Sequence, residues 1–138
     1  MKALYLETSA VLTWLLGQAH AEEVRDAVSA ADAVVTSALT FAETGRALVR
    51  ARQEGLLRAA DVQRLRGLLQ RARAGWMTMV VSDEILARTA HSFPVEPVRT
   101  LDAIHLATAL ELTKAFPELT ILSFDRRILD NAAALGIC

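Results

Sequence analysis

The sequence predicts an α/β protein with a parallel sheet covered by helices on both faces. Short apolar runs alternate with longer helical patterns along the 138 residues. The apolar runs are continuous, which is typical of strands buried on both sides. Alanine and leucine dominate the composition, and aromatic residues make up only 5% of it. This composition favours helix-rich packing over an all-β sandwich.

Each predicted strand is a short apolar run that leads into a helical segment. The expected strands cover residues 3–6, 32–36, 77–81 and 120–124. In folds with parallel strands and covering helices, functional groups gather at the carboxyl ends of the strands. The residues that follow these four runs are therefore the first place to look for a functional site.

The predicted helices are marked by capping residues and glycine stops. They are expected over about residues 9–17, 21–30, 37–53, 59–74, 83–91, 99–116 and 125–136. Thr8 or Ser9 is placed to cap the first helix, and Ser37 and Ser82 open two later ones. Two prolines in residues 93–97 require a loop there.

The cysteine content and the N-terminus favour a cytoplasmic protein. The only cysteine, Cys138, is the last residue, so a disulfide within the chain is impossible and pairing between chains is the less favoured alternative. Residues 1–7 have one basic residue and too short an apolar run for a signal peptide. No stretch reaches the roughly 18 apolar residues of a membrane span, so no membrane partner is expected.

The net charge of −1 hides an uneven distribution. Between Arg46 and Arg73 lie eight arginines opposed only by Glu54 and Asp61, so this segment carries +6 and the rest of the chain −7. A basic segment beside an acidic remainder is what a metal site next to a nucleic-acid track would produce. A solvated helical hairpin whose arginines serve solubility or a protein partner explains the charge equally well.

Four carboxylates stand in apolar or helix-opening surroundings: Glu7, Glu43, Asp102 and Asp125. A buried acid is costly unless something positive meets it. Glu7 and Asp125 each follow a predicted strand, so both are expected at the carboxyl edge of the sheet. Asp102 lies in the first turn of a helix with apolar sides, which predicts that it faces a cleft or a cation.

Each acid also has a simpler structural explanation. Glu7 would cap the next helix, although the two hydroxyl residues after it already offer that function and Glu is a poorer cap than Asp. Glu43 would pair with Arg46, three residues further on. Asp125 is well placed to cap the last helix, and the helix dipole alone favours an acid in a first turn.

Together the four acids favour a divalent cation. Mutually repelling carboxylates in one cleft would have raised and coupled pKa values, and a hard cation relieves that repulsion. Mg²⁺ or Mn²⁺ prefers oxygen ligands, whereas zinc is disfavoured because His and Cys do not cluster. His105, three residues after Asp102, is expected to be a packed or hydrogen-bonded helix residue rather than a ligand.

Four segments carry the acids in a specific order and spacing. They are Tyr5–Ala10, Ser37–Glu43 with Arg46–Leu48, Leu101–Ala109 and Leu122–Asp125. The segment around Asp102, Leu-Asp-Ala-Ile-His-Leu-Ala-Thr-Ala, is the most specific of them. Over nearly the whole chain, this pattern resembles the PIN-domain family, and within it the VapC-type toxin ribonucleases of type II toxin–antitoxin systems.

The resemblance implies a single PIN-like domain over residues 1–138, folded as a three-layer α/β/α sandwich around a short parallel sheet. It implies a Mg²⁺- or Mn²⁺-dependent endoribonuclease that cleaves RNA, is commonly a homodimer and is held inactive by a cognate antitoxin. The catalytic and metal-binding acids would be Glu7, Glu43, Asp102 and Asp125, supported by Thr8 and Ser9. Contacts with RNA or a partner are assigned to Arg46, Arg50 and Arg99.

One position departs from the family pattern, because the first acid is usually Asp and here it is Glu7. The extra methylene moves the carboxylate out by about 1.5 Å, and octahedral Mg²⁺ is demanding about geometry. A catalytically weak or inactive PIN-like module that binds a protein partner is therefore the alternative. A receiver-type phosphoryl-transfer domain is disfavoured, since it needs a lysine after a late strand and the only lysines are Lys2 and Lys114.

Overall fold

The computed structural model describes residues 1–138, and the order of its elements confirms the predicted alternation of strands and helices. The four strands are β1 (Ala3–Leu6), β2 (Ala33–Ser37), β3 (Met77–Met79) and β4 (Thr120–Leu122). The seven helices are α1 (Thr8–Leu15), α2 (Ala21–Ala30), α3 (Ala38–Gln53), α4 (Ala59–Arg73), α5 (Asp83–Thr89), α6 (Thr100–Leu112) and α7 (Arg126–Leu135).

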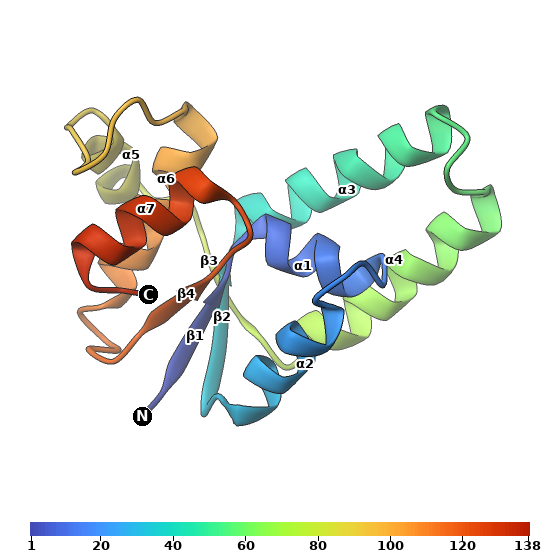
Figure 1. Cartoon of the computed structure of the whole chain (residues 1–138), viewed down its shortest axis with the longest axis horizontal. Coiled ribbons are helices and arrows are strands. Elements are labelled where there is room, and N and C mark those ends of the chain that lie inside the picture. Colours follow the sequence, from blue (N-terminus) through green and yellow to red (C-terminus); the bar gives the residue numbers. More distant parts are fainter.

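The strands form one parallel sheet in the order β3-β2-β1-β4 (Figure 1). Tyr5 of β1 pairs with Val35 on one side and Ile121 on the other, so β1 is central. All strands point the same way, and their carboxyl ends meet at one edge of the sheet. The parallel sheet predicted from the continuous apolar runs is confirmed.

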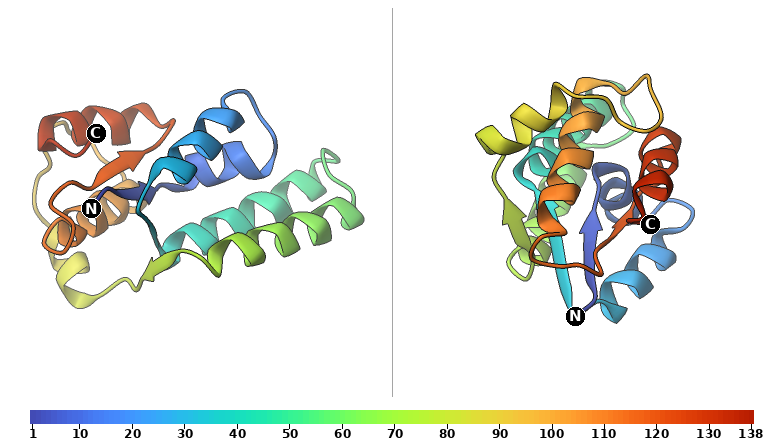
Figure 2. Two further views of the ribbon diagram at one scale, coloured as in Figure 1. Left: turned by 90° about the horizontal axis from the view of Figure 1, so that it is seen from below. Right: turned by 90° about the vertical axis from the view of Figure 1, so that its left-hand side faces the viewer.

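Alternate residues of β1 face opposite sides of the sheet and separate the interior into two cores. Tyr5 belongs to a core formed with α5, α6 and α7, whereas Leu4 and Leu6 belong to a core formed with α1, α2, α3 and α4. The two groups of helices lie on opposite sides of the sheet (Figure 2). The three-layer α/β/α sandwich is therefore confirmed.

Local capping explains where most helices begin. The side chains of Ser37, Ser82 and Asp125 each accept a hydrogen bond from a backbone amide in the first turn of α3, α5 and α7. The predicted cap of α1 is wrong, because Glu7 rather than Thr8 or Ser9 is its N-cap residue. Glu7 can serve because its longer side chain folds back so that the carboxylate reaches the Ser9 amide.

Several elements end earlier than the sequence predicts; α1 and α5 do so by two residues each, and β4, α6 and β3 are also shorter. The strand β4 ends at Leu122, because the next amides turn away from the sheet: that of Phe124 donates to the Ser9 hydroxyl and that of Asp125 to the Ser123 hydroxyl. The helix α6 ends at Leu112 and continues as turns, since a proline at position 117 disfavours helix before it. The strand β3 ends at Met79.

The helices α3 and α4 form an antiparallel hairpin that projects from the sandwich as an arm (Figures 1 and 2). All eight arginines of the segment between Arg46 and Arg73 are exposed on it. Only Arg58 and Arg64 are paired with a carboxylate, that of Asp61. The arm therefore presents uncompensated positive charge to solvent. No helix in the structure is both long and apolar enough to cross a membrane.

The helix α6 is buried on nearly all sides, as its apolar sequence predicts. Leu106 is fully buried in the core that α6 forms with Tyr5, α5 and α7, so we expect Leu106→Ala to lower the free energy of unfolding by about 2–5 kcal/mol. Leu101, on the same helix, is 47% exposed, and Leu101→Ala should cost far less. Chemical denaturation of both variants measures the difference. Equal losses would contradict this packing of α6.

Candidate functional site

The carboxylate of Glu7 lies at the carboxyl end of β1 and is only 4% exposed. Its Oε2 accepts a hydrogen bond from the Ser9 amide at 2.6 Å, and its Oε1 accepts one from the Ser123 hydroxyl at 3.3 Å. Burial raises the pKa of the Glu7 carboxyl above its ordinary value, although the bond from Ser9 acts in the opposite direction. Keeping Glu7 ionised in the folded protein therefore costs free energy.

The carboxylate of Glu43 comes from α3 and reaches the same edge of the sheet. Its Oε1 accepts hydrogen bonds from the Thr8 hydroxyl at 2.6 Å and from His105 Nε2 at 2.6 Å. Burial alone would raise the pKa of the Glu43 carboxyl, but these two bonds outweigh it and lower the pKa. The simpler explanation of Glu43 as a partner of Arg46 is not what the structure shows.

Asp125 is tied to Glu7 through a pair of serines. Its carboxylate caps α7 by accepting a bond from the Arg127 amide at 2.9 Å. Its own amide donates to the Ser123 hydroxyl at 3.0 Å, and that hydroxyl lies 3.2 Å from the Ser9 hydroxyl. Both the capping explanation and a place beside Glu7 therefore hold for Asp125.

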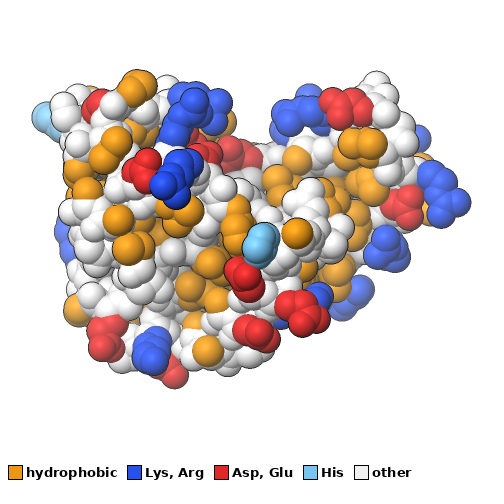
Figure 3. Space-filling model, viewed as in Figure 1, with side chains coloured by type: hydrophobic (Ala, Val, Ile, Leu, Met, Phe, Trp, Pro, Cys, Tyr) orange, Lys and Arg blue, Asp and Glu red, His pale blue; other side chains and the backbone are white.

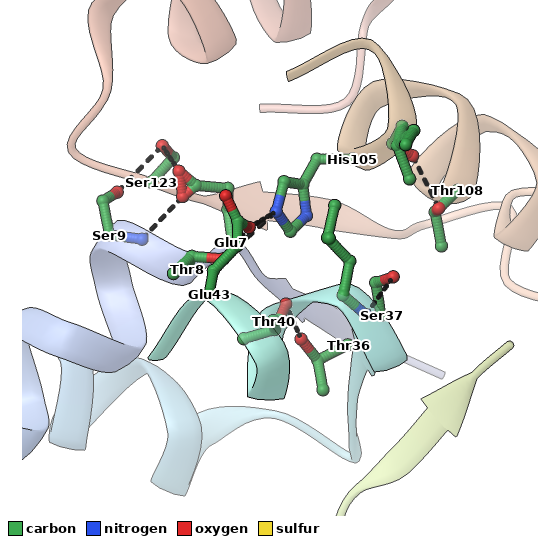
Figure 4. A network of polar contacts seen from close by, with 12 residues as sticks. Glu7, Thr8, Ser9, Thr36, Ser37, Thr40, Glu43, His105, Thr108 and Ser123 are labelled. Atoms are coloured by element: carbon green, nitrogen blue, oxygen red, sulfur yellow. Dashed lines mark hydrogen bonds and ion pairs between the residues drawn. The ribbon is translucent and has the colours of Figure 1, made fainter. Parts of the chain in front are cut away.

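Figure 4 shows how these groups converge. Glu7, Thr8 and Ser9 lie at the end of β1 and the start of α1, with Ser123 on one side and Glu43 and His105 on the other. Two predicted acids, Glu7 and Glu43, are thus linked through neighbouring residues of one short turn. In Figure 3, acidic side chains lie at the floor of a hollow with basic side chains on both sides.

Asp102 is separate from this hydrogen-bonded network. It lies in the first turn of α6, where its side chain is largely buried, and its Oδ2 pairs with Arg99 Nε at 3.4 Å. It makes no hydrogen bond with Glu7, Glu43 or Asp125. The structure therefore links Glu7 and Glu43 through the adjacent residues Thr8 and Ser9 and connects the amide of Asp125 to Glu7 through Ser123, whereas Asp102 has an arginine partner three residues away.

The predicted arginines fall into two groups. Arg46 and Arg50 line a groove of about 500 Å³ between α1 and α3, with Thr8, Glu43 and Leu101 among its other lining residues. Arg99 instead pairs with Asp102, although most of its side chain is exposed. The groove brings two unpaired cations next to a carboxylate of the site, an arrangement that suits a phosphate backbone.

The four acids supply the type of oxygen donor that a hard divalent cation prefers, but their side chains are not arranged around a common metal position. As the side chains lie, no group of three or more His, Cys, Asp or Glu residues is arranged to hold a metal ion. All the predicted donors are carboxylate oxygens, which is the donor set that Mg²⁺ and Mn²⁺ prefer. Each oxygen of Glu7 already accepts one hydrogen bond, whereas Glu43 Oε2 accepts none from the protein and is open to a ligand.

Sequence reasoning missed two contributors to the site. The hydroxyl of Ser123 connects β4 to both Glu7 and Asp125, and the hydroxyl of Tyr5 lies 2.7 Å from His105 Nδ1. His105 is hydrogen-bonded in its helix, as predicted, but its partners had not been identified. Ser123 could have been found from its position at the end of a strand next to Asp125, whereas Tyr5 gave no local signal.

Comparisons with known proteins identify the family. The PIN domain family model matches residues 4–135. Ribonuclease VapC35 of Mycobacterium tuberculosis is 30% identical over 136 residues, covering 97% of this chain and 93% of the relative. Ribonuclease VapC46 of the same organism is 32% identical over 141 residues, covering 99% and 95%.

A solved structure supports the fold. The crystal structure of Mycobacterium tuberculosis VapC20, described as a sarcin-ricin loop cleaving toxin, superposes with a TM-score of 0.67 over 98% of this chain and 96% of that one. The two chains are only 15% identical, so this likeness concerns the fold alone. The family model and the two sequence relatives go further, and they show that the chain belongs to the PIN-domain family and, within it, to the VapC-type ribonucleases.

Proposed function

We propose that this protein is a metal-dependent endoribonuclease that acts as the toxin of a toxin–antitoxin pair. The observation that carries the proposal is the hydrogen-bonded network at the carboxyl edge of the sheet, in which Thr8 and Ser9 hold Glu43 and Glu7, and Ser123 links Glu7 to the amide of Asp125. It occurs in a chain whose relatives are named ribonucleases. An acidic site flanked by a basic groove suits hydrolysis of a phosphodiester, since the substrate is an anion that the acids alone would repel.

The cation in this proposal is Mg²⁺ or Mn²⁺, held by Glu7, Asp102 and Asp125 with Glu43 completing the ligand set. When bound, such an ion polarises a phosphoryl oxygen and lowers the pKa of an attacking water. The protein's own part is to present these oxygens from separate rigid elements, the ends of β1 and β4 and the helices α3 and α6.

The other residues of the site position its carboxylates and the RNA. Thr8 and Ser9 donate to Glu43 and Glu7 and so fix where these oxygens lie. Arg46 and Arg50 would bind the RNA backbone in the groove beside Glu43, which makes binding sensitive to salt. A carboxylate of the site would accept the proton of the attacking water. A single-stranded or loop region of RNA fits best, because its phosphates are accessible.

The expected partners are an antitoxin and a second copy of the chain, in the cytoplasm. Exposed apolar side chains in and just after the edge strand β3 support a protein interface: Met77 is 53% exposed and Val80 67%, and Leu86 of the following helix α5 is 46% exposed. Such side chains favour contact with another protein surface when they lie together. The strand β3 is also an edge strand, with one side open to pairing.

We expect Asp102→Asn to lower RNA cleavage by a hundredfold or more, on the order of the loss when a catalytic carboxylate is removed. Asp130→Asn is the matched control, because Asp130 is an exposed acid on α7 that pairs with Arg126. The assay uses purified protein, Mn²⁺ or Mg²⁺, and a mixed pool of single-stranded and stem-loop RNAs. EDTA should abolish cleavage by the parent protein.

Cleavage that survives both EDTA and Asp102→Asn would refute the metal-nuclease proposal. Failure of the parent protein to cleave RNA or to bind Mn²⁺ would instead favour the protein-interaction module. Calorimetric titration with Mn²⁺ distinguishes that case from an RNA pool that lacks the target.

Glu7→Asp should retain or raise cleavage, because Asp is the residue usual in the family and is also a good helix cap. Glu7→Gln should lower cleavage, because the amide keeps the cap but removes the charge. The two variants are compared in the same assay at saturating Mn²⁺. Parent-like activity of Glu7→Gln would show that Glu7 is not a ligand.

Without metal, the stability of the parent protein should fall as pH rises from the ordinary pKa of a glutamic acid to the raised pKa of folded Glu7. In that window the unfolded chain has lost the proton that the folded chain still holds, so ionisation favours unfolding. Glu7→Gln cannot ionise, and its free energy of unfolding should increase relative to the parent's across this window. Denaturation in EDTA at several pH values measures this, and a constant difference would contradict it.

A further inference from the structure

Two buried polar side chains lie behind Glu43 and have no part in the proposed function so far. Tyr5 is fully buried in the central strand β1, and His105 in α6 is 2% exposed. Their rings meet edge to face, with centroids 6.0 Å apart and planes at 74°. Polar groups at this depth destabilise a protein unless each finds a partner, so each contact of this pair is informative.

The contact with Glu43 determines which ring nitrogen of His105 carries a hydrogen. His105 Nε2 lies 2.6 Å from Glu43 Oε1, and an ionised carboxylate can only accept hydrogen bonds. The Thr8 hydroxyl donates to the same Oε1 at 2.6 Å, so this oxygen acts as an acceptor. His105 Nε2 must therefore be the donor.

The contact with Tyr5 occupies the other ring nitrogen. The Tyr5 hydroxyl lies 2.7 Å from His105 Nδ1. Burial, with a contribution from Glu7, raises the pKa of this hydroxyl well above its ordinary value, so it keeps its hydrogen. With the hydrogen of His105 on Nε2, the Nδ1 lone pair can accept, and the Tyr5 hydroxyl is placed to donate to it. Tyr5 thus favours the imidazole form with its hydrogen on Nε2, the form that Glu43 requires.

Only one of the two carboxylate oxygens of Glu43 accepts hydrogen bonds from these residues. Oε1 accepts from both His105 and Thr8, whereas Oε2 accepts no hydrogen bond from the protein. Glu43 also lines the groove that contains Arg46 and Arg50. Two donors on one oxygen fix the orientation of the carboxylate and leave the other oxygen for a ligand.

We propose that His105 is a positioning residue for Glu43 and that the Tyr5 hydroxyl holds it in the required tautomer. The three side chains come from β1, α6 and α3, so the hydrogen-bonded chain Tyr5–His105–Glu43 spans the sheet and a helix from each layer. The effect of this chain on catalysis rests on the proposed nuclease function, whereas the tautomer can be measured without any activity.

The tautomer is tested by long-range ¹H–¹⁵N spectra of the parent protein labelled at histidine. Of the three histidines, His20 and His91 are exposed, and the signals of His105 are identified by their loss in His105→Gln. We expect hydrogen on Nε2 and none on Nδ1, with the Nδ1 resonance moving in Tyr5→Phe. Hydrogen on Nδ1, or on both nitrogens, would overturn the proposal.

The positioning role is tested by the kinetics of Tyr5→Phe, which removes one buried oxygen and keeps the ring. We expect kcat to fall roughly two- to tenfold, the effect of one hydrogen bond, with KM unchanged because Tyr5 touches no solvent. Thr36→Val is the matched control, since Thr36 is equally buried and donates to the Leu6 carbonyl. It should lower the melting temperature without lowering kcat.

A pair of substitutions at His105 separates positioning from packing. The amide of Gln can place an N–H near the position of Nε2, whereas Leu fills a similar volume and donates nothing. We expect His105→Gln to recover much of the kcat that His105→Leu loses. Melting curves check that both variants fold. If His105→Leu does not fold, the kinetics of Tyr5→Phe and the histidine spectra test the positioning role instead.

The outcomes separate this inference from the proposed function. Parent-like kcat in Tyr5→Phe and His105→Leu, with Asp102→Asn inactive, would overturn the positioning role and leave the nuclease function standing. Equal kcat for His105→Gln and His105→Leu would also overturn it. If the parent protein cleaves no RNA, the nuclease function fails while the spectra still decide the tautomer.

Discussion

The site depends on one constraint: a carboxylate at the end of a buried strand must be met by donors from the same chain. Glu7 shows how strongly this shapes the fold. Its two oxygens are met by the Ser9 amide and the Ser123 hydroxyl, which join β1, the start of α1 and the end of β4. Ser123 also receives the amide of Asp125 and so sets where α7 begins. Satisfying one buried acid thereby fixes the edge of the sheet on which a second acid lies.

Both Glu7 and Glu43 are partly removed from solvent and met by donors, yet the pKa of one is raised and that of the other is lowered. Burial dominates at Glu7 and raises its pKa, whereas at Glu43 the bonds from His105 and Thr8 outweigh burial and lower the pKa. Pairs of titratable groups whose surroundings move their pKa values apart are typical of sites with divided roles. The difference arises from the donors: Glu43 receives a histidine N–H in addition to a hydroxyl, while Glu7 has backbone and serine donors only.

Features of the fold that depend on neighbouring residues or on a repeating apolar pattern could be predicted from the sequence. Continuous apolar runs predicted the strands, and Ser37 and Asp125 marked helix starts within three residues of the amides they cap. The cap formed by Glu7 was ranked below caps by Thr8 or Ser9, because cap preferences place Glu below the hydroxyl residues beside it. The contact of Tyr5 with His105 joins positions 100 residues apart, and no spacing rule reaches that far. Side-chain partners across the sheet are therefore the part of the site that required a structure.

The acids also differ in how many of their carboxylate oxygens already accept a hydrogen bond from the protein. Glu7 uses both oxygens on the protein, whereas Glu43 Oε2 accepts nothing and Asp102 has only the long contact with Arg99. The open oxygens lie on the helices α3 and α6, and Arg46 lines the groove beside Glu43. In the proposed nuclease, a phosphate with its counter-cation would therefore meet these open oxygens without displacing any hydrogen bond of the Glu7 cap. In the proposed nuclease, recruiting Glu7 to that cation would offset the free-energy cost of a charge that burial penalises.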